Sequence, residues 1–183
     1  MAERTWCGDY GKDAVNAGGA VMNRNLKPYQ HTVQYYETDR MGITHHSNYI
    51  RWMEEARIDF MKQIGWDYAK LEELGIISPV LGLSCEYKES TTFSDLVLID
   101  IKVLSFTGVR MELGYEMRKV TGPENADVLQ RDADSLFSAG ALVCEAASRH
   151  CFLDANGRPV RLKRDYPELY ECLMQYVVLK DAE

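Results

Sequence analysis

Hydrophobic positions recur along this chain with two different periods, and each period predicts a different kind of element. Between residues 47 and 64 the apolar side chains return every three or four positions, as they do on one face of a helix. The residues that form this face are Tyr49, Met53, Ala56 and Phe60. We expect a strand over 31–36 before the helix, a helix end at Gly65, and a shorter helix over 67–74.

Beyond Pro79 the apolar and polar residues alternate one by one, which is typical of half-buried strands. We expect strands over 81–87, 97–103, 111–117 and 136–153. A polar stretch over 121–134 is expected to form a long hairpin connection, and Asn156-Gly157 is expected to form a turn. The last expected element is a helix over 165–180.

The order of these elements is one strand, a long helix and then about four antiparallel strands. Such a sheet needs its apolar face covered, and the helix over 47–64 is the only early element long enough to cover it. The expected fold class is therefore α+β, in a single domain over 31–183. Residues 1–30 follow neither period and mix charges with glycines, so we expect a flexible N-terminal extension there. Neither an internal repeat nor a second hydrophobic core is expected.

Composition and charge exclude several classes of protein. The chain has 183 residues, of which 46% are hydrophobic and 27% are charged, an ordinary globular balance. A net charge of −7 disfavours nucleic acid as a partner, because an acidic surface repels phosphates. No run of about 18 apolar residues offers a membrane span. The five cysteines are odd in number and form no C-x-x-C pair, so we expect reduced thiols in a cytoplasmic protein.

Motifs for the common cofactors and metals are missing from the sequence. It contains no G-x-G-x-x-G, no G-x-x-x-x-G-K-[ST] and no H-E-x-x-H. His45 and His46 are adjacent, so they cannot easily face one metal ion together, and no third ligand has a suitable spacing. The segment "GLSCE" over 82–86 is not a nucleophile elbow, because Glu86 replaces the second glycine. We therefore expect neither a cofactor nor a metal ion.

Asp39 lies between the first strand and the long helix, in a connection that contains Gly42. An aspartate in such a place commonly stabilises a turn. It can also serve catalysis, because the first N–H groups of the following helix are unpaired and carry partial positive charge. A helix end of this kind can polarise a carbonyl and hold the oxyanion that develops when the carbonyl is attacked. An acid and an oxyanion site in one segment would suffice for acyl transfer or hydrolysis.

The segment "YYETDRMGITHHSNYIRWMEEAR" resembles the signature of hotdog-fold acyl-CoA thioesterases of the hydroxybenzoyl-CoA thioesterase type. That signature is an apolar strand, T-D, x-x-G, a short apolar pair, H-x-N-Y and an aromatic helix with E-x-A-R. The matching residues are Thr38, Asp39, Gly42, Ile43, His46, Asn48, Tyr49, Trp52, Glu54, Glu55, Ala56 and Arg57. A later segment, "HCFLDANGRPVRL" over 150–162, is similar to the last long strand of the family and its turn, so the resemblance covers about 31–163.

This resemblance implies a hotdog fold, in which an antiparallel sheet of about five strands wraps around a long central helix. It implies that Asp39 is the catalytic carboxylate, as nucleophile or general base, and that the backbone N–H of His46 polarises the thioester carbonyl. Gly42 would let the backbone approach closely. Asn48 and Tyr49 would fix the helix start and the acyl pocket. On the residues alone, Asn48 can also be a simple helix cap and Tyr49 plain core.

Three further charged residues are candidates for the site. Another branch of hotdog thioesterases uses a glutamate on the long helix, which makes Glu54 and Glu55 alternative catalytic acids, although both can also be solvated helix charges. Lys88 follows a strand that should edge the site and could bind the CoA phosphates, although a solvent-exposed lysine is the simpler interpretation. The connection over 121–134 is longer than the family suggests and could shape substrate access or a subunit contact.

The resemblance leads us to expect an enzyme that hydrolyses an acyl-CoA, or an acyl-carrier-protein thioester, to the free acid and the thiol. The alternative is a non-catalytic hotdog module that binds acyl-CoA, but binding alone needs no carboxylate such as Asp39 beside the carbonyl. A hotdog dehydratase is a weaker option, since that chemistry uses a different motif. Family members pair their sheets and build active sites at the dimer interface, so we expect a homodimer or homotetramer. The acyl group cannot be read from the sequence.

Overall fold

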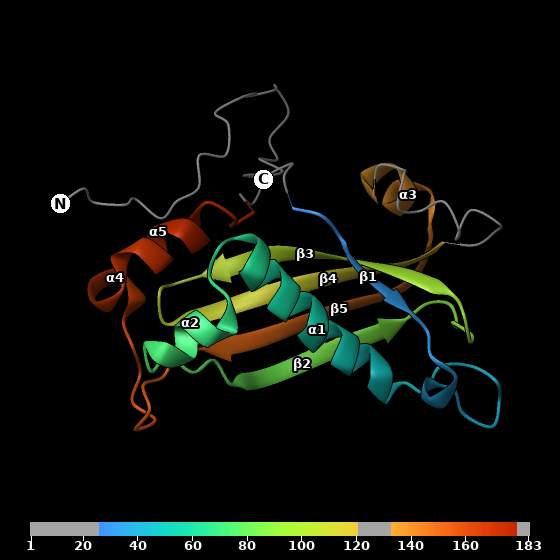
Figure 1. The fold of residues 1–183 in the computed structure, drawn as a ribbon, viewed down its shortest axis with the longest axis horizontal. Coiled ribbons are helices and arrows are strands. Elements are labelled where there is room, and N and C mark those ends of the chain that lie inside the picture. Colours follow the sequence, from blue (N-terminus) through green and yellow to red (C-terminus); the bar gives the residue numbers. More distant parts are fainter. Residues whose placement is uncertain (1–25, 121–132, 179–183) are drawn as a thin grey trace.

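An antiparallel sheet of five strands carries one long helix across its face (Figure 1). The computed structural model describes residues 26–120 and 133–178. The strands are β1 (Tyr29–Thr32), β2 (Val80–Tyr87), β3 (Leu96–Phe106), β4 (Arg110–Val120) and β5 (Ala141–Cys151). Their order in the sheet is β1-β3-β4-β5-β2, so β1 and β2 form its two edges. The arrangement is the α+β one that the sequence predicts.

The long helix, α1 (Ser47–Gln63), lies within one residue of its expected bounds and buries its apolar face against the sheet. The fully buried side chains of the helix and the strands include Trp52, Met61, Leu113 and Met117. Gly65 follows the helix with a φ of +79°, which glycine adopts freely, and its N–H donates to the Lys62 carbonyl. The short helix α2 (Tyr68–Glu73) comes next, capped by the side chain of Asp67.

The first strand differs from the one expected over 31–36. β1 starts at Tyr29 and ends at Thr32, and the next residues form a 3-10 turn, η1 (Tyr35–Glu37). The chain leaves the sheet here because the Glu37 carboxylate, rather than a neighbouring strand, accepts the N–H of Gln34 at 2.7 Å. Glu37, which closes η1, therefore stands two positions before Asp39.

A short helix, α3 (Ala133–Ala139), occupies the start of the segment expected as a strand over 136–153. The helix ends where the Gly140 N–H donates to the Leu136 carbonyl, and β5 begins at the next residue. A second, smaller hydrophobic cluster forms around it, although none was expected: Leu96, Leu98, Val120, Leu136 and Phe137. The expected strand was too long because a short apolar run fits a helix as well as a strand.

The C-terminal segment forms two short helices instead of the single helix expected over 165–180. These are α4 (Leu162–Asp165) and α5 (Pro167–Met174), and Tyr166 separates them with a φ of −144°. A residue that precedes proline avoids the helical region, and Pro167 then starts the second helix.

Parts of three expected features lie outside the described residues. These parts are residues 1–25 of the expected extension, residues 121–132 of the expected connection, and residues 179–180 of the expected last helix. Within the described ranges, no helix is long and apolar enough to cross a membrane.

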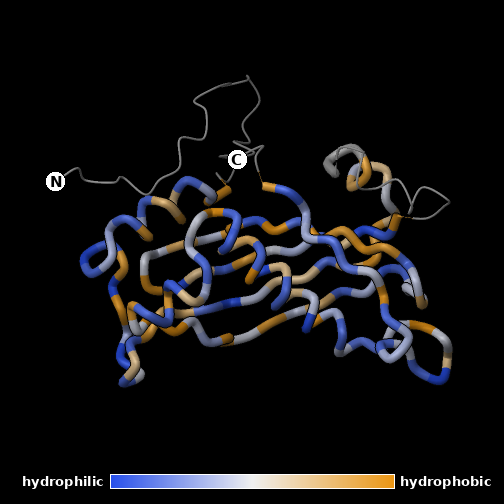
Figure 2. The backbone as a smooth tube through the Cα atoms, in the orientation of Figure 1, coloured by the Kyte–Doolittle hydropathy of each residue, from blue (hydrophilic) through white to orange (hydrophobic). Residues whose placement is uncertain are grey.

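The edge strand β2 is present where the sequence predicts it, but its apolar side chains are not buried. Val80, Leu81, Leu83 and Tyr87 are 50%, 51%, 45% and 47% exposed. Figure 2 shows the mixture of hydrophobic and hydrophilic residues along this strand and its neighbours. β2 pairs only with β5 in the described sheet, so its other edge is open.

Candidate functional site

A tight turn between η1 and α1 carries Asp39. Thr38 and Thr44 form an isolated antiparallel bridge at its base, and the Asp39 N–H donates to the Ile43 carbonyl at 2.9 Å. Gly42, with a φ of +75°, donates its N–H to the Asp39 carbonyl at 2.9 Å. Because L side chains rarely adopt such a φ, glycine is suited to this position. The turn brings Asp39 close to the start of α1.

The Asp39 carboxylate also stabilises its own turn. Its Oδ1 accepts the N–H of Met41 at 2.7 Å, an Asx-type hydrogen bond. Among the residues that the structure describes, none donates a hydrogen bond to Oδ2. The turn role and the catalytic role are therefore compatible, because one oxygen holds the backbone and the other remains available.

The amino end of α1 offers backbone donors beside this turn. His46 occupies the N-cap position and its side chain makes no cap hydrogen bond, while the N–H of Ser47 donates to His45 Nδ1 at 3.4 Å. No acceptor for the His46 N–H occurs in the described part of the chain. Asn48 is not the helix cap that the sequence allows, since it lies within the helix. Asn48 instead donates from Nδ2 to the Glu37 carbonyl at 2.8 Å.

A pocket of about 250 Å³ opens between this turn, the helix start and the end of β2. Its lining brings together four residues singled out from the sequence: Asp39, His46, Tyr49 and Lys88. The other lining residues are Met41, Ile43, Thr44, Tyr87, Glu89 and Ser90. Gly42 and Asn48 do not line the pocket, but the first shapes its turn and the second fixes the helix beside it.

The two alternative acids on α1 do not line this pocket. The Glu54 side chain is 65% exposed and pairs loosely with Arg57 at 3.7 Å. Glu55 is 45% exposed, lies 3.3 Å from a ring nitrogen of His31 and accepts the Tyr29 hydroxyl at 3.1 Å. Both therefore resemble the solvated helix charges that the sequence also allowed.

Lys88 lines the pocket, yet its ammonium group already has two acidic partners. It lies 2.8 Å from a Glu86 carboxylate oxygen and 3.1 Å from one of Glu145. Hydrogen bonds to Glu86 and Glu145 raise the pKa of Lys88, so this ammonium stays charged. A positive charge is thus present at the pocket, and its contact with CoA phosphates stays a prediction.

The sequence did not single out Thr44 and Tyr87, which line the pocket, or Thr91, which bonds to two lining residues. The fully buried Thr91 hydroxyl donates to Thr44 Oγ1 at 2.7 Å and lies 3.0 Å from the Tyr49 hydroxyl. Tyr87 donates to the His46 carbonyl at 3.2 Å. Burial raises the pKa of Tyr49, and burial together with Cys85 raises that of Tyr87 to about 12. Both tyrosines are therefore neutral hydrogen-bonding groups and not bases at neutral pH.

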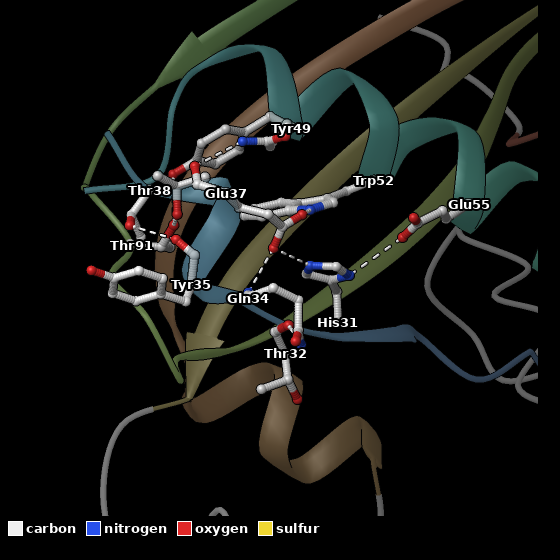
Figure 3. A network of polar contacts seen from close by, with 12 residues as sticks. His31, Thr32, Gln34, Tyr35, Glu37, Thr38, Tyr49, Trp52, Glu55 and Thr91 are labelled. Carbon is white, nitrogen blue, oxygen red and sulfur yellow. Dashed lines mark hydrogen bonds and ion pairs between the residues drawn. The ribbon is translucent and has the colours of Figure 1, made fainter. Parts of the chain in front are cut away.

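Glu37 is another residue that sequence reasoning missed, and its side chain points toward Trp52 and His31 (Figure 3). Its carboxylate is buried and accepts hydrogen bonds from Gln34 N–H, His31 Nε2 and Trp52 Nε1. Burial alone would raise the pKa of this carboxyl group, but the three donors outweigh burial and lower it. Glu37 is therefore ionised at neutral pH.

A buried serine and histidine on β5 resemble a hydrolase dyad but cannot act as one. Ser148 Oγ lies 2.7 Å from His150 Nε2, and the Arg57 guanidinium lies 3.3 Å from His150 Nδ1. Arginine can only donate, so Nδ1 accepts and the ring proton sits on Nε2. Nε2 then donates to Ser148 and cannot take its proton. The acids that line the pocket at the start of α1 are Asp39 and Glu89, and Asp39 is the one carried by the turn that precedes the helix.

No group of three or more histidine, cysteine or acidic side chains that could hold a metal ion occurs within residues 26–120 and 133–178. The rings of His45 and His46 lie 4.1 Å apart.

Comparison with known proteins places this geometry in a family. The model of the thioesterase-like superfamily matches residues 33–173. A Bacillus subtilis protein named "Putative acyl-CoA thioesterase YneP" is 27% identical over 137 residues, which are 74% of this chain and 86% of its own. The solved structure of the DHNA-CoA thioesterase from Staphylococcus aureus aligns with a TM-score of 0.68 at 27% identity, over 81% of this chain and 89% of its own.

A solved structure of a hypothetical protein from Aquifex aeolicus aligns with a TM-score of 0.64 at 29% identity, over 79% of this chain and 97% of its own. The hotdog fold and the thioesterase resemblance expected from the sequence are thereby confirmed at the level of the family. The chain belongs to the thioesterase-like superfamily and is a hotdog-fold enzyme of the thioesterase class.

Proposed function

We propose that this enzyme hydrolyses an acyl-CoA to the free acid and CoA, with Asp39 as the catalytic carboxylate and the amino end of α1 as the oxyanion site. The observation that carries the proposal is the pocket, which is lined by the Asp39 turn, the start of α1 and the end of β2. A carboxylate and a helix N–H beside one small pocket are the two groups that thioester hydrolysis needs.

Two routes are open to this arrangement. As a nucleophile, the Asp39 carboxylate attacks the thioester carbon, the CoA thiolate leaves, and water cleaves the resulting anhydride. As a general base, the carboxylate takes a proton from water, whose oxygen attacks the same carbon; the C–S bond then breaks, and the CoA thiolate leaves and takes up that proton. Negative charge develops on the carbonyl oxygen in both routes, and the His46 N–H would donate to that oxygen.

The names of two relatives support CoA as the leaving group. One is named "Putative acyl-CoA thioesterase YneP" and the other is named as a DHNA-CoA thioesterase. We propose that Lys88 contacts the phosphates of CoA. Its pairs with Glu86 and Glu145 are exposed ion pairs, which are weak enough to exchange for a phosphate.

We also propose that the working enzyme is a homodimer, with a pair of dimers as the larger assembly. The pocket volume of about 250 Å³ falls below the roughly 300–1,000 Å³ of most ligand sites, which favours completion by a second protomer. The open edge of β2, whose end lines the pocket, is the surface that a second protomer would extend.

A thiol-release assay across short-chain, long-chain and aromatic acyl-CoAs tests the proposed function. We expect at least one of them to be turned over without added metal and in the presence of a chelator. The blank lacks the enzyme, and calorimetry measures binding of the same compounds. Binding without thiol release from any of them would contradict the enzyme and support a non-catalytic acyl-CoA-binding module.

A further inference from the structure

Glu37 accepts five hydrogen bonds, which come from three parts of the chain (Figure 3). Its carboxylate accepts from His31 Nε2 on β1 at 2.8 Å, from Gln34 N–H at 2.7 Å and from Trp52 Nε1 on α1 at 2.8 Å. Its carbonyl accepts from the His45 N–H at 2.8 Å and from Asn48 Nδ2 at 2.8 Å. Strand, turn and helix are therefore joined at one residue.

These contacts persist because the carboxylate is deeply buried. Glu37 is only 4% exposed, and a buried carboxylate that loses its donors cannot recover the lost hydrogen bonds from water. Hydrogen bonds to an ionised acceptor are also about twice as strong as those between neutral groups. The carboxylate therefore fixes the three donors relative to one another.

The turn that carries Asp39 is held by Glu37 at both of its ends. The turn leaves Glu37 through Thr38, and it returns at His45, whose N–H donates to the Glu37 carbonyl. We propose that Glu37 is a positioning residue for the hydrolysis, which holds Asp39 against the amino end of α1 so that both act on one carbonyl. The proposal rests on the proposed function of Asp39.

The amide of glutamine cannot replace this carboxylate. The Glu37 carboxylate faces three donors with two oxygens, whereas an amide has one oxygen and an NH₂ group that only donates. If the NH₂ replaced Oε1 it would face the Trp52 N–H, and if it replaced Oε2 it would face the N–H of Gln34. Either orientation sets one donor against another, so Glu37→Gln should displace the turn while nearly preserving the volume of the side chain.

The test compares steady-state kinetics of Glu37→Gln, Asp39→Asn and the double variant. Glu37→Gln should lower kcat by about 10- to 100-fold, since a misplacement of about 1 Å can cost that much, and should change KM little. The kcat of the double variant should be little lower than that of Asp39→Asn alone. Once the Asp39 carboxylate is gone, its position relative to the amino end of α1 no longer affects the rate. Asp67→Asn is the matched control: this acid also accepts a backbone N–H, but it caps α2, so kcat should stay at the parent's value.

A double variant whose kcat falls by the product of the two single factors would overturn the proposal, because Glu37 would then act independently of Asp39. The proposal would also be overturned if Glu37→Gln had the parent's kcat while Asp39→Asn was inactive. If Asp39→Asn itself keeps the parent's kcat, the proposed function is what fails.

A second pair of variants decides the matter if Glu37→Gln does not fold. His31→Leu removes one donor to Glu37, whereas His31→Gln keeps an N–H donor in its place. We expect His31→Leu to lower kcat with little change in KM, and His31→Gln to restore most of it. Equal kcat values in the parent and both His31 variants would overturn the proposal.

Discussion

Burial and the neighbouring charge of Arg57 together determine the protonation state of His150. Arg57 is 6% exposed and donates to the Ser78 carbonyl at 3.2 Å and to His150 Nδ1 at 3.3 Å. His150 is 1% exposed and lies 2.7 Å from the Ser148 hydroxyl. Burial, followed by the nearby charge of Arg57, lowers the pKa of His150 to about 4. His150 is therefore a neutral structural group in the folded protein.

This lowered pKa predicts a loss of stability in mild acid. Above about pH 6.5 His150 is neutral in both states, but between pH 6.5 and about 4 only the unfolded chain takes up the proton. The contribution of His150 should fall by up to about 1.4 kcal/mol per pH unit in that window. Urea unfolding of the parent and of His150→Asn, measured from pH 4.5 to 7.5, should show a steeper decline in the parent.

The exposed histidine His45 supplies the control, because His45→Gln should keep the slope of the parent. Equal slopes in the parent and His150→Asn would contradict the account of His150.

Among individual residues, the sequence locates those site residues that lie close together along the chain and misses those that meet only in the folded structure. Asp39, His46 and Tyr49 fall within a dozen residues of one another, so a local pattern can include all of them. Thr91 joins the pocket through Thr44, 47 residues away, and Glu37 meets Trp52 only because α1 folds back over the turn. Contacts of that kind depend on the tertiary fold, and no spacing along the chain reveals them.

Among the elements, those with a long and regular period are the ones that the sequence predicts well. α1 has one apolar face over its whole length and a glycine after its end, and its expected bounds are nearly correct. The turn at Asn156-Gly157 is also present, with a φ of +77° at Gly157. Short elements were predicted less well. Residues 136–139 of α3 are expected as strand and residues 133–134 as connection, and the break between α4 and α5 is not expected although Pro167 marks it.

The alternation of apolar and polar residues along β2 did not predict how exposed its side chains are. Cys85 lies 3.7 Å from the sulfur of Met53, so this set of alternate residues faces α1. Leu83 and Tyr87 belong to the same set and are nevertheless about half exposed. Alternation shows which side chains share a face, but only the neighbours of the strand decide whether that face is covered.

For the whole molecule, this uncovered edge predicts a homodimer. A free strand edge with exposed apolar side chains favours pairing with another chain, and a two-fold dimer would place β2 against its copy. Light scattering at micromolar concentration should give at least twice the 20.9 kDa mass of the chain. Leu83→Lys should shift the mass toward the monomer and lower activity, because the site would lose the second protomer.

Leu74→Lys serves as the control for the dimer, because it places the same charge at an exposed apolar residue that ends α2 and is not part of β2. A parent that scatters only as a 20.9 kDa monomer would contradict the dimer.

The catalytic role of Asp39 is the central claim, and Asp39→Asn tests it most directly. The exchange keeps an oxygen that can accept the Met41 N–H, so the turn and the fold should survive. It removes the charge that attacks the thioester or activates water, which should lower kcat by about 100- to 10,000-fold. Glu54→Gln and Glu55→Gln, with side chains outside the pocket, should have milder effects.

The decisive measurement is thus the kcat of Asp39→Asn for the best acyl-CoA substrate, beside the two helix variants. A folded Asp39→Asn that still binds substrate but has lost at least about 99% of its turnover is the predicted result. More than about a tenth of the parent's kcat in Asp39→Asn, with a helix glutamine variant inactive, would move the catalytic acid to α1 and contradict the account.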